Sequence, residues 1–547
     1  MREPARGLGV SPGRAAGPAY RMARPPELPG RAPVTDAAAE VKAAAEALEA
    51  VAEHLERHAA KAADAEARAI LEAQSMIAAD PMLLESVEEG VAAGLGAAHA
   101  IDAGCARHRE ALLAAGGYFA DRAGDLDDIR NRAVAAVLGL PMPGVPDPGH
   151  PYVLVADDLA PADTATLDTA VVLALVTERG GPTSHTAILA RALGLPAVVA
   201  CRDAAGVEDG TWVAVDGGAG ELLIGIAEDE AARIGEEAGR ERERVAAGTG
   251  PGVTADGHAV PLLLNIGSAR DLRPDAEGVG LFRTEFLFLD RAGAPTFEEQ
   301  VAAYTVVLRA LPGRRVVVRT LDAGSDKPLP FLGLPDEENP ALGVRGLRTA
   351  RRDPGVLDTQ LRAIAEAHRA CEADTWVMAP MVSTVAEAAG FAAKARAHGL
   401  PTVGVMIEVP AAALHAERVL REVDFLSIGT NDLGQYTFAA DRQHGDLADL
   451  LDPWQPALLH LVKLCGDAGR AAGKPVGVCG EAAADPLLAP VLVGLGMTSL
   501  SMSAPAVPAV RASLSERTLG SCQERAAAAL AAAGPSAARE AVTTSTR

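Results

Sequence analysis

The feature that most constrains the fold is a series of eight short apolar runs in the second half of the chain, most of them separated by stretches with helical periodicity. The runs cover residues 260-266, 278-284, 315-321, 375-381, 402-408, 424-429, 475-479 and 499-502. Strands that alternate with helices are typical of parallel sheets, and eight of them predict a (β/α)8 barrel of the TIM type. We expect this barrel to occupy residues 253-520, followed by a C-terminal helix and a tail in residues 521-547 that frays from Gly534 onward, where the residues are small and polar.

Polar or reactive residues stand just past the predicted strands. They are Asn265, Arg283, Glu285, Arg319, Glu408, Asn431, Asp432, Cys479, Glu481 and Ser503. Because barrels build their active sites at the carboxyl ends of the strands, these positions predict a functional site at one face of the barrel.

Two of these strand ends, on neighbouring strands, carry the carboxylates Glu408 and Asp432. Two acidic residues alone are more often a surface or salt-bridge pair. Here three arginines, Arg283, Arg319 and Arg442, are expected on the same face, and arginines are suited to bidentate binding of a phosphate and a carboxylate. The set therefore favours a site for Mg²⁺, which takes one or two carboxylates together with substrate oxygens and waters.

Cys479 ends another predicted strand, next to a glycine. A buried cysteine usually acts as a small apolar residue, and we interpret Cys105 and Cys465 in that way. The position of Cys479 within the expected site makes it a candidate for acid catalysis.

A glycine-rich turn, Gly180–Thr186, follows a predicted strand and precedes a predicted helix over residues 187-193. Thr183 or Ser184 can cap this helix, which puts His185 in its first turn. There the free N–H groups and the helix dipole favour a neutral imidazole, which is nucleophilic, and also favour an attached phosphoryl group. A lone histidine at such a place more often makes a structural hydrogen bond, but the flanking sequence favours the nucleophile.

The first half of the chain changes its pattern twice, which predicts a multidomain α/β protein. Residues 1-30 and 139-225 contain short apolar strands, helical segments and glycine turns, and predict one compact α/β domain. Residues 31-138 are helical and carry an apolar seam, which favours a helical bundle inserted into that domain over a free coiled coil. Residues 226-252 predict a charged helical linker that ends in a glycine- and proline-containing hinge.

The net charge of −23 argues against nucleic acid and anionic membrane surfaces as partners. The six cysteines show neither disulfide nor metal-ligand spacing, as expected in a reducing compartment. No run approaches the roughly 18 apolar residues that would span a bilayer. We therefore expect a soluble, cytoplasmic protein.

Nine segments match a known family. They are GLGVSPGRAAG, GGPTSHTAILARALGLPAV, GVGLFRTEFLFLDR, VVVRTLDAGSDK, EENPALGVRG, IEVPAA, SIGTNDLGQYTFAADR, VCGE and SMS. Through them the chain resembles, over nearly its whole length, Enzyme I, the phosphoenolpyruvate-protein phosphotransferase of the bacterial sugar phosphotransferase system.

The resemblance implies a role for each candidate residue. His185 would be phosphorylated by phosphoenolpyruvate, and Cys479 would be the proton donor that completes pyruvate. Magnesium and substrate would be bound by a further set, namely Glu408 and Asp432 for Mg²⁺ and Arg283, Arg319, Asn431 and Arg442 for phosphoenolpyruvate. One departure is Pro182, where many members have arginine. Loss of this nearby positive charge is expected to alter the rate of phosphoryl transfer, whereas the nucleophile His185 is unchanged.

The resemblance also implies partners. The helical insertion would dock the histidine phosphocarrier protein HPr, the barrel would form a homodimer, and the reaction would be the first step of sugar uptake. Because His185 must reach both the phosphorus bound in the barrel and the docked partner, we expect the phosphohistidine domain to swivel at the linker of residues 228-252. Related dikinases and phosphoenolpyruvate synthases are alternatives, but the chain has no room for their nucleotide-grasp domain, and they tend to carry alanine at the position of Thr186. A regulatory phosphocarrier with an inactive barrel is a second alternative, against which the intact barrel residues argue.

Overall fold

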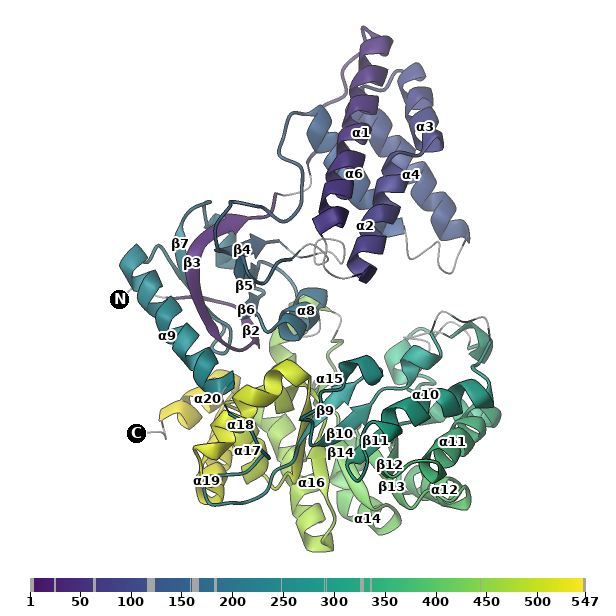
Figure 1. The fold of residues 1–547 in the computed structure, drawn as a ribbon, viewed down its shortest axis with the longest axis vertical. Coiled ribbons are helices and arrows are strands. Elements are labelled where there is room, and N and C mark those ends of the chain that lie inside the picture. The colour runs from purple at the N-terminus through teal and green to yellow at the C-terminus, as the bar shows by residue number, and fades with distance from the viewer. Residues whose placement is uncertain are drawn as a thin grey trace. The chain divides into compact units, whose positions relative to one another are not determined.

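The computed structural model describes residues 4–23, 26–61, 65–115, 123–157, 159, 167–181, 184–246, 248–289, 291, 293–324, 329–334, 337–442 and 444–544. Its chain divides into two compact units, Met1–Ala238 and Gly239–Arg547. Figure 1 shows the helices and strands of both units, coloured along the sequence.

The helical part of the first unit is a bundle, as the sequence predicts. Its helices are α1 (Ala37–Lys61), α2 (Ala65–Ala78), α3 (Pro81–Ala92), α4 (Ala97–Ala115) and α6 (Ala123–Val137). The apolar seam lies on α1, where Leu48 and Leu55 are buried and Val41 packs at the edge of the same core. Burial of one face of each helix supplies the driving force that such alanine-rich helices lack on their own.

The rest of the first unit is an α/β domain built on one sheet. Its strands are β1 (Ala5–Arg6), β2 (Leu8–Ser11), β3 (Arg14–Arg21), β4 (Tyr152–Ala156), β5 (Val172–Thr177), β6 (Ala197–Val199), β7 (Trp212–Asp216) and β8 (Glu221–Ile224), in the spatial order β1-β8-β7-β3-β4-β5-β6-β2. Strand β3 pairs in parallel with β4 and antiparallel with β7. The N-terminal segment therefore completes a sheet whose other strands follow the helical insertion.

A charged helix, α9 (Glu228–Ala246), leads to the second unit. The chain after it is attached to the barrel at two points. An Nη1 nitrogen of Arg511 donates to the carbonyl oxygen of Gly248 at 3.1 Å, and the amide of Gly252 donates to Oε1 of Glu277 at 2.9 Å. Flexibility of this linker is therefore restricted on its C-terminal side.

The second unit is a closed barrel of parallel strands, as predicted. They are β9 (Leu262–Ile266), β10 (Gly278–Phe282), β11 (Arg315–Arg319), β12 (Asp374–Ala379), β13 (Thr402–Ile407), β14 (Phe425–Ile428), β15 (Val476–Val478) and β16 (Ser499–Met502), and β16 pairs with β9 to close the ring. Each predicted apolar run overlaps one of these strands.

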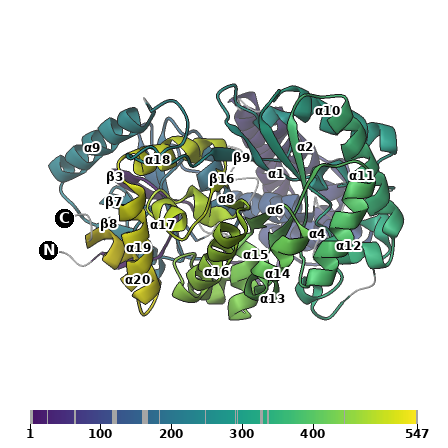
Figure 2. The ribbon, with the colours of Figure 1, turned by 90° about the horizontal axis from the view of Figure 1, so that it is seen from below.

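Helices pack around the barrel strands (Figure 2). They are α10 (Phe297–Arg309), α11 (Pro354–Arg369), α12 (Val385–Ala397), α13 (Pro410–Leu414), α14 (Ala416–Glu422), α15 (Thr430–Phe438), α16 (Pro456–Ala472), α17 (Ala489–Gly494), α18 (Val507–Ser515), α19 (Leu519–Ala531) and α20 (Pro535–Thr544). The largest apolar core of the protein lies between these helices and the strands. Within the described ranges, none of the helices combines the length and the apolar content that crossing a bilayer requires.

The expected fraying from Gly534 onward is not observed over residues 535-544. These residues form α20, in which Ala538 and Val542 are fully buried. The guanidinium of Arg539 also binds the Asp452 carboxylate through both terminal nitrogens, at 2.7 and 2.9 Å. Tertiary packing therefore orders a segment whose small and polar residues predict disorder.

Candidate active site

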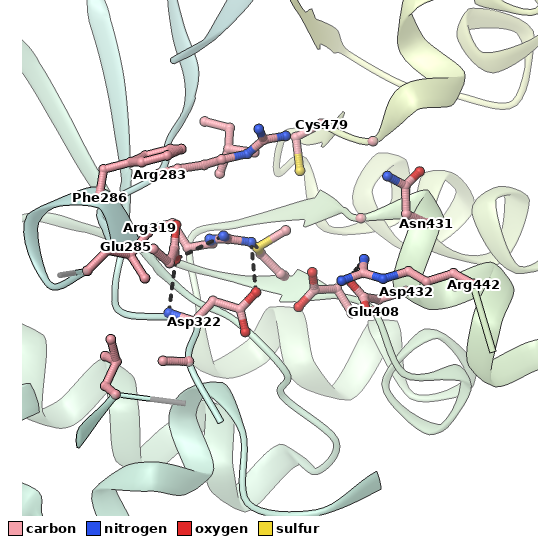
Figure 3. A pocket seen from close by; sticks show the side chains of 17 residues that line it. Arg283, Glu285, Phe286, Arg319, Asp322, Glu408, Asn431, Asp432, Arg442 and Cys479 are labelled. Carbon is pink, nitrogen blue, oxygen red and sulfur yellow. Dashed lines mark hydrogen bonds and ion pairs between the residues drawn. The ribbon is translucent and has the colours of Figure 1, made fainter. Parts of the chain in front are cut away.

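A cavity of about 360 Å³ opens at the carboxyl ends of the barrel strands (Figure 3). Seven residues that the sequence nominates line it, namely Arg283, Arg319, Glu408, Asn431, Asp432, Arg442 and Cys479. Of the other nominated strand-end residues, Glu285 also lines the cavity, whereas Asn265, Glu481 and Ser503 are absent from its described lining.

Glu408 follows β13 and is 1% exposed. Its Oε2 accepts a hydrogen bond from the Met381 amide at 2.8 Å, and Met381 has a φ of 58°, a conformation that is uncommon outside glycine. Gly429 leaves room for this carboxylate, since a Cβ there would lie 2.8 Å from Oε1. Burial, followed by the charges of Asp432 and Asp322, raises the pKa of Glu408 well above its ordinary value.

Asp432 lies in the first turn of α15, and its carboxylate faces two arginines. Oδ1 accepts from Nη1 of Arg345 at 2.9 Å, and Oδ2 accepts from Nη1 of Arg442 at 3.2 Å. Figure 3 shows the carboxylates of Glu408 and Asp432 in the same part of the cavity. Carboxylate oxygens have more than one acceptor site, so these ion pairs leave capacity for a further ligand.

Arg319 ends β11 and is held between two acidic residues. Its Nη2 donates to Oε1 of Glu285 at 2.9 Å, and its Nη1 lies 3.2 Å from Oδ2 of Asp322. Burial would make an isolated charge unfavourable, and the two ion pairs offset that cost. The guanidinium is therefore fixed on the wall of the cavity, as Figure 3 shows.

Arg345, Asp322 and Glu285 complete this network, and only Glu285 is among the residues predicted for the site. Arg345 is 1% exposed and contacts both Asp322 and Asp432. A signal was present, because Asp322 lies three residues after Arg319 and Arg345 belongs to the segment EENPALGVRG. Asp322 directly follows the predicted run 315-321, whereas Arg345 lies in no predicted strand.

Arg283 and Asn431 also line the cavity. Arg283 comes directly after β10 and makes no ion pair with any residue that the structure describes. Oδ1 of Asn431 accepts from the amide of Glu481 at 3.4 Å. Arg283 is therefore the cavity arginine best able to meet an anionic group.

Cys479 follows β15 and is 3% exposed, with its sulfur directed into the cavity (Figure 3). The thiol lies 3.6 Å from the carbonyl oxygen of Ile428. Burial raises the pKa of the Cys479 thiol to about 11, although a hydrogen bond with the Ser427 side chain acts in the opposite direction. The sulfur therefore carries a proton at neutral pH, as a general acid must.

His185 is the first residue of α8 (His185–Leu193), in the first compact unit. Ser184 is the N-cap of this helix, and its Oγ accepts from the Ala187 amide at 3.3 Å. Gly180 has a φ of 102°, so the turn before the helix uses the conformational freedom of glycine. The backbone of His185 thus lies at the positive end of the helix dipole. Pro182, the departure from the family pattern, and Thr183, a possible helix cap, lie outside the described residues.

Comparison with known proteins links both units to one group of enzymes. Three family models match the chain: a PEP-utilising enzyme N-terminal domain over residues 6–122, a PEP-utilising enzyme mobile domain over 148–220 and a PEP-utilising enzyme PEP-binding domain over 241–519. The last of these covers the barrel and its cavity.

Curated relatives match over most of their length. A phosphoenolpyruvate-protein phosphotransferase of Streptomyces coelicolor is 58% identical over 485 residues, which are 88% of this chain and 87% of the relative. One from Haloferax volcanii is 42% identical over 471 residues, covering 82% of each chain. An NMR solution structure of an Enzyme I protein is 31% identical, and the match covers 44% of this chain and 99% of that one, with a TM-score of 0.39.

Proposed function

This chain belongs to the phosphoenolpyruvate-protein phosphotransferase family, and on that premise we propose that it transfers the phosphoryl group of phosphoenolpyruvate first to His185 and then to the histidine phosphocarrier protein HPr. The observation that carries this proposal is the convergence of three arginines, four carboxylates and a protonated thiol on one cavity of the barrel. An anionic substrate and a proton-transfer step need these groups together.

Phosphoenolpyruvate carries a phosphate and a carboxylate, and we assign both to Arg283, Arg319, Asn431 and Arg442. Arg319 is fixed by Glu285 and Asp322, and Arg442 by Asp432, so their geometry is set before the substrate binds. Arg283 supplies positive charge that no described carboxylate neutralises. Preorganised charge of this kind stabilises a transition state without reorganisation during the reaction.

Glu408 and Asp432 are the residues that we propose bind Mg²⁺. The donor set fits this ion, because both ligands are carboxylates and the carboxylates of Asp432 and Asp322 disfavour the ionised form of Glu408, an effect that a cation would offset. No group of three histidine, cysteine or acidic side chains is arranged as a metal cage among the described residues, which agrees with an ion that also uses water and substrate oxygens. When bound, Mg²⁺ supplies charge neutralisation on the phosphoryl oxygens.

In the first half-reaction, a ring nitrogen of His185 attacks the phosphorus of phosphoenolpyruvate. The N–P bond forms as the P–O bond to the enolate breaks, and the arginines neutralise the charge on both groups. Cys479 then gives its thiol proton to the methylene carbon of the enolate, which yields pyruvate and leaves a thiolate. In the second half-reaction, a histidine of HPr accepts the phosphoryl group.

Several finer assignments belong to the same proposal. We assign HPr docking to the helical bundle. It exposes two apolar side chains that a partner could cover, Met76 near the end of α2 and Met82 near the start of α3, which are 74% and 65% exposed. We also propose a cytoplasmic enzyme that forms a homodimer through its barrel and serves the first step of phosphotransferase-system sugar uptake. The domain boundaries stated above stay predictions, as does the swivel of the phosphohistidine domain.

The test is to incubate the full-length protein with labelled phosphoenolpyruvate, Mg²⁺ and purified HPr. We expect acid-labile, base-stable label on His185, its transfer to HPr, and one pyruvate released for each phosphoryl group. The same protein offered labelled ATP serves as the control and should take up no label. Labelling by ATP, or labelling without pyruvate release, would contradict the proposed reaction.

A further inference from the structure

The interior of the barrel below Cys479 is unusually polar. Barrel interiors are normally filled by layers of branched aliphatic side chains. Here Ser427 on β14 and Ser499 and Ser501 on β16 line a small cavity in the interior, and all three are at most 7% exposed. Gly477, on the strand between them, pairs with Ser427 on one side and Ser499 on the other. A Cβ at Gly477 would lie 2.6 Å from Oγ of Ser499. Glycine at this position therefore leaves room for the Ser499 hydroxyl in the barrel interior.

This small cavity adjoins Cys479 on two sides. Ser427, which lines the cavity, pairs across the sheet with Gly477, two residues before Cys479, and its side chain lowers the pKa of the Cys479 thiol against the larger effect of burial. On the other side, Nδ2 of Asn265 donates to the carbonyl oxygen of Cys479 at 3.0 Å, and Oδ1 of Asn265 accepts from the Ser501 hydroxyl. The side chain of Ser427 is therefore the link that reaches the sulfur itself.

The cavity is large enough for a water molecule. Its volume is about 20 Å³, and roughly 10 to 15 Å³ is needed for one water. Besides the serines it is lined by Arg315 and Trp376, which are partly exposed at the amino-terminal end of the barrel. The Arg315 guanidinium lies 3.9 Å above the Trp376 ring, and its buried Nε has no hydrogen-bond partner among the described residues. A water here would find several polar partners.

We propose that Ser427 is a positioning residue for Cys479, and that it returns a proton to the Cys479 thiolate from a water in the cavity at the base of the barrel. The inference rests on the proposed function, in which Cys479 protonates the enolate. The thiolate then takes the Ser427 hydroxyl proton as the S–H bond forms, and Ser427 takes a proton from the water. Solvent neutralises the hydroxide that remains, so each pyruvate consumes one solvent proton and no oxidation occurs.

The position of this route explains why it would be useful. Cys479 lines the substrate cavity on one side, where bound pyruvate or enolate lies between the sulfur and the solvent. A proton that arrives through Ser427 comes from the opposite side of the sulfur and does not cross the bound product. The thiol can therefore be restored before the substrate cavity empties.

The test uses rapid mixing of the full-length enzyme with labelled phosphoenolpyruvate, Mg²⁺ and excess HPr, and compares the wild type with Ser427→Ala, Ser427→Thr and Ser499→Val. In Ser427→Ala we expect first-turnover labelling of His185 within about twofold of wild type and a burst of one pyruvate per site, followed by a steady state at least about tenfold slower. Ser499→Val, which fills the cavity, should show the same burst.

Ser427→Thr restores the hydroxyl and should recover most of the steady-state rate. Ser513→Ala, which removes a hydroxyl bonded to the Pro486 carbonyl oxygen outside the barrel interior, is the matched control and should behave as wild type.

The outcomes separate this inference from the proposed function. A wild-type enzyme that neither labels His185 nor releases pyruvate would overturn the proposed function itself. If the wild type is active, three results would overturn the role of Ser427: wild-type turnover in Ser427→Ala, an equal loss of labelling and pyruvate formation in that variant, or no recovery in Ser427→Thr. Wild-type turnover in Ser499→Val would overturn the route through the cavity.

Discussion

Arg345 and Asp322 form a buried ion pair in which Nε and Nη2 of the arginine donate to the two carboxylate oxygens at 3.1 and 3.2 Å. Both side chains are 1% exposed. On its other side Arg345 contacts Asp432, and Asp322 also pairs with Arg319. One buried pair therefore connects a proposed metal ligand with a proposed substrate-binding arginine.

Breaking this pair should be costly. Asp322→Asn leaves Arg345 without its bidentate partner, and removing one member of a buried pair typically costs about 3 to 5 kcal/mol. We expect the barrel's urea-induced unfolding to move to clearly lower urea concentration. Glu417→Gln, which removes a partner of Arg421 on the surface of α14, is the control and should cause no resolvable change. Equal effects of the two substitutions would show that the network contributes little to stability.

Glu408→Gln should change stability and metal binding in opposite directions. Because the pKa of Glu408 is raised above its ordinary 4.5, the folded barrel holds this proton more tightly than the unfolded chain does. That contribution to stability is complete below the ordinary pKa and is lost as the pH rises through the raised one. Without divalent metal, the glutamine variant should therefore unfold at higher temperature than wild type at about pH 8 and at a similar temperature at about pH 4.

Calorimetry should show at the same time that the Glu408→Gln variant binds Mg²⁺ more weakly. In the wild type, Mg²⁺ affinity should rise with pH, because binding requires the ionised carboxylate. Glu481→Gln, at a strand end outside the cavity lining, is the control. Unchanged Mg²⁺ affinity in Glu408→Gln would remove Glu408 from the proposed metal site.

Cys479→Ala should slow pyruvate formation far more than it changes the KM for phosphoenolpyruvate, because a proton donor acts on the enolate and not on the bound substrate. The loss should be on the order of a hundredfold, at the lower end of what general acid catalysis contributes. Cys465→Ala removes a buried thiol on α16, away from the cavity, and should leave turnover unchanged. If Cys479→Ala forms pyruvate at the wild-type rate, Cys479 is a buried structural residue and not the proton donor.

His185→Ala should abolish incorporation of label from phosphoenolpyruvate while circular dichroism and the unfolding transition stay unchanged. The control is His460→Ala, since His460 is an exposed histidine on α16 whose ring nitrogen contacts the carbonyl oxygen of Pro456. It should be labelled like wild type. Undiminished labelling of the His185 variant would place the phosphorylated residue elsewhere.

Cutting the chain in the linker should separate the two half-reactions. A fragment of residues 1-247 keeps His185 and the helical bundle, and the first compact unit ends at Ala238 within it. Once circular dichroism shows that it is folded, it should accept label in reverse from phosphorylated HPr. It should accept none from phosphoenolpyruvate, because Arg283 and Glu408 are missing. If phosphoenolpyruvate labels the fragment and phosphorylated HPr does not, the donor site or the docking site has been assigned to the wrong unit.

The sequence by itself determined the barrel, the bundle and the place of His185 in its helix. These features rest on local signals, since strand and helix periodicity, a glycine turn and the Ser184 cap all act within a few residues. Strand ends then predict most of the polar residues that line the cavity, because parallel strands present their carboxyl ends at one face. Arg283, Glu408 and Cys479 are examples, since each directly follows a barrel strand and lines the cavity.

Tertiary structure alone decided which charges pair and which side chains become buried together. Arg345 meets Asp322 and Asp432 from segments 23 and 87 residues away, and no local period records such a contact. The same holds for Ser427. Its sequence pattern predicts only a strand residue, and the pairing of β14 with β15 places it near Cys479. It holds also for α20, whose weak apolar pattern becomes ordered because the barrel's outer layer buries Ala538 and Val542. Burial and pairing depend on the whole fold, and they set the pKa values from which the chemistry of the site follows.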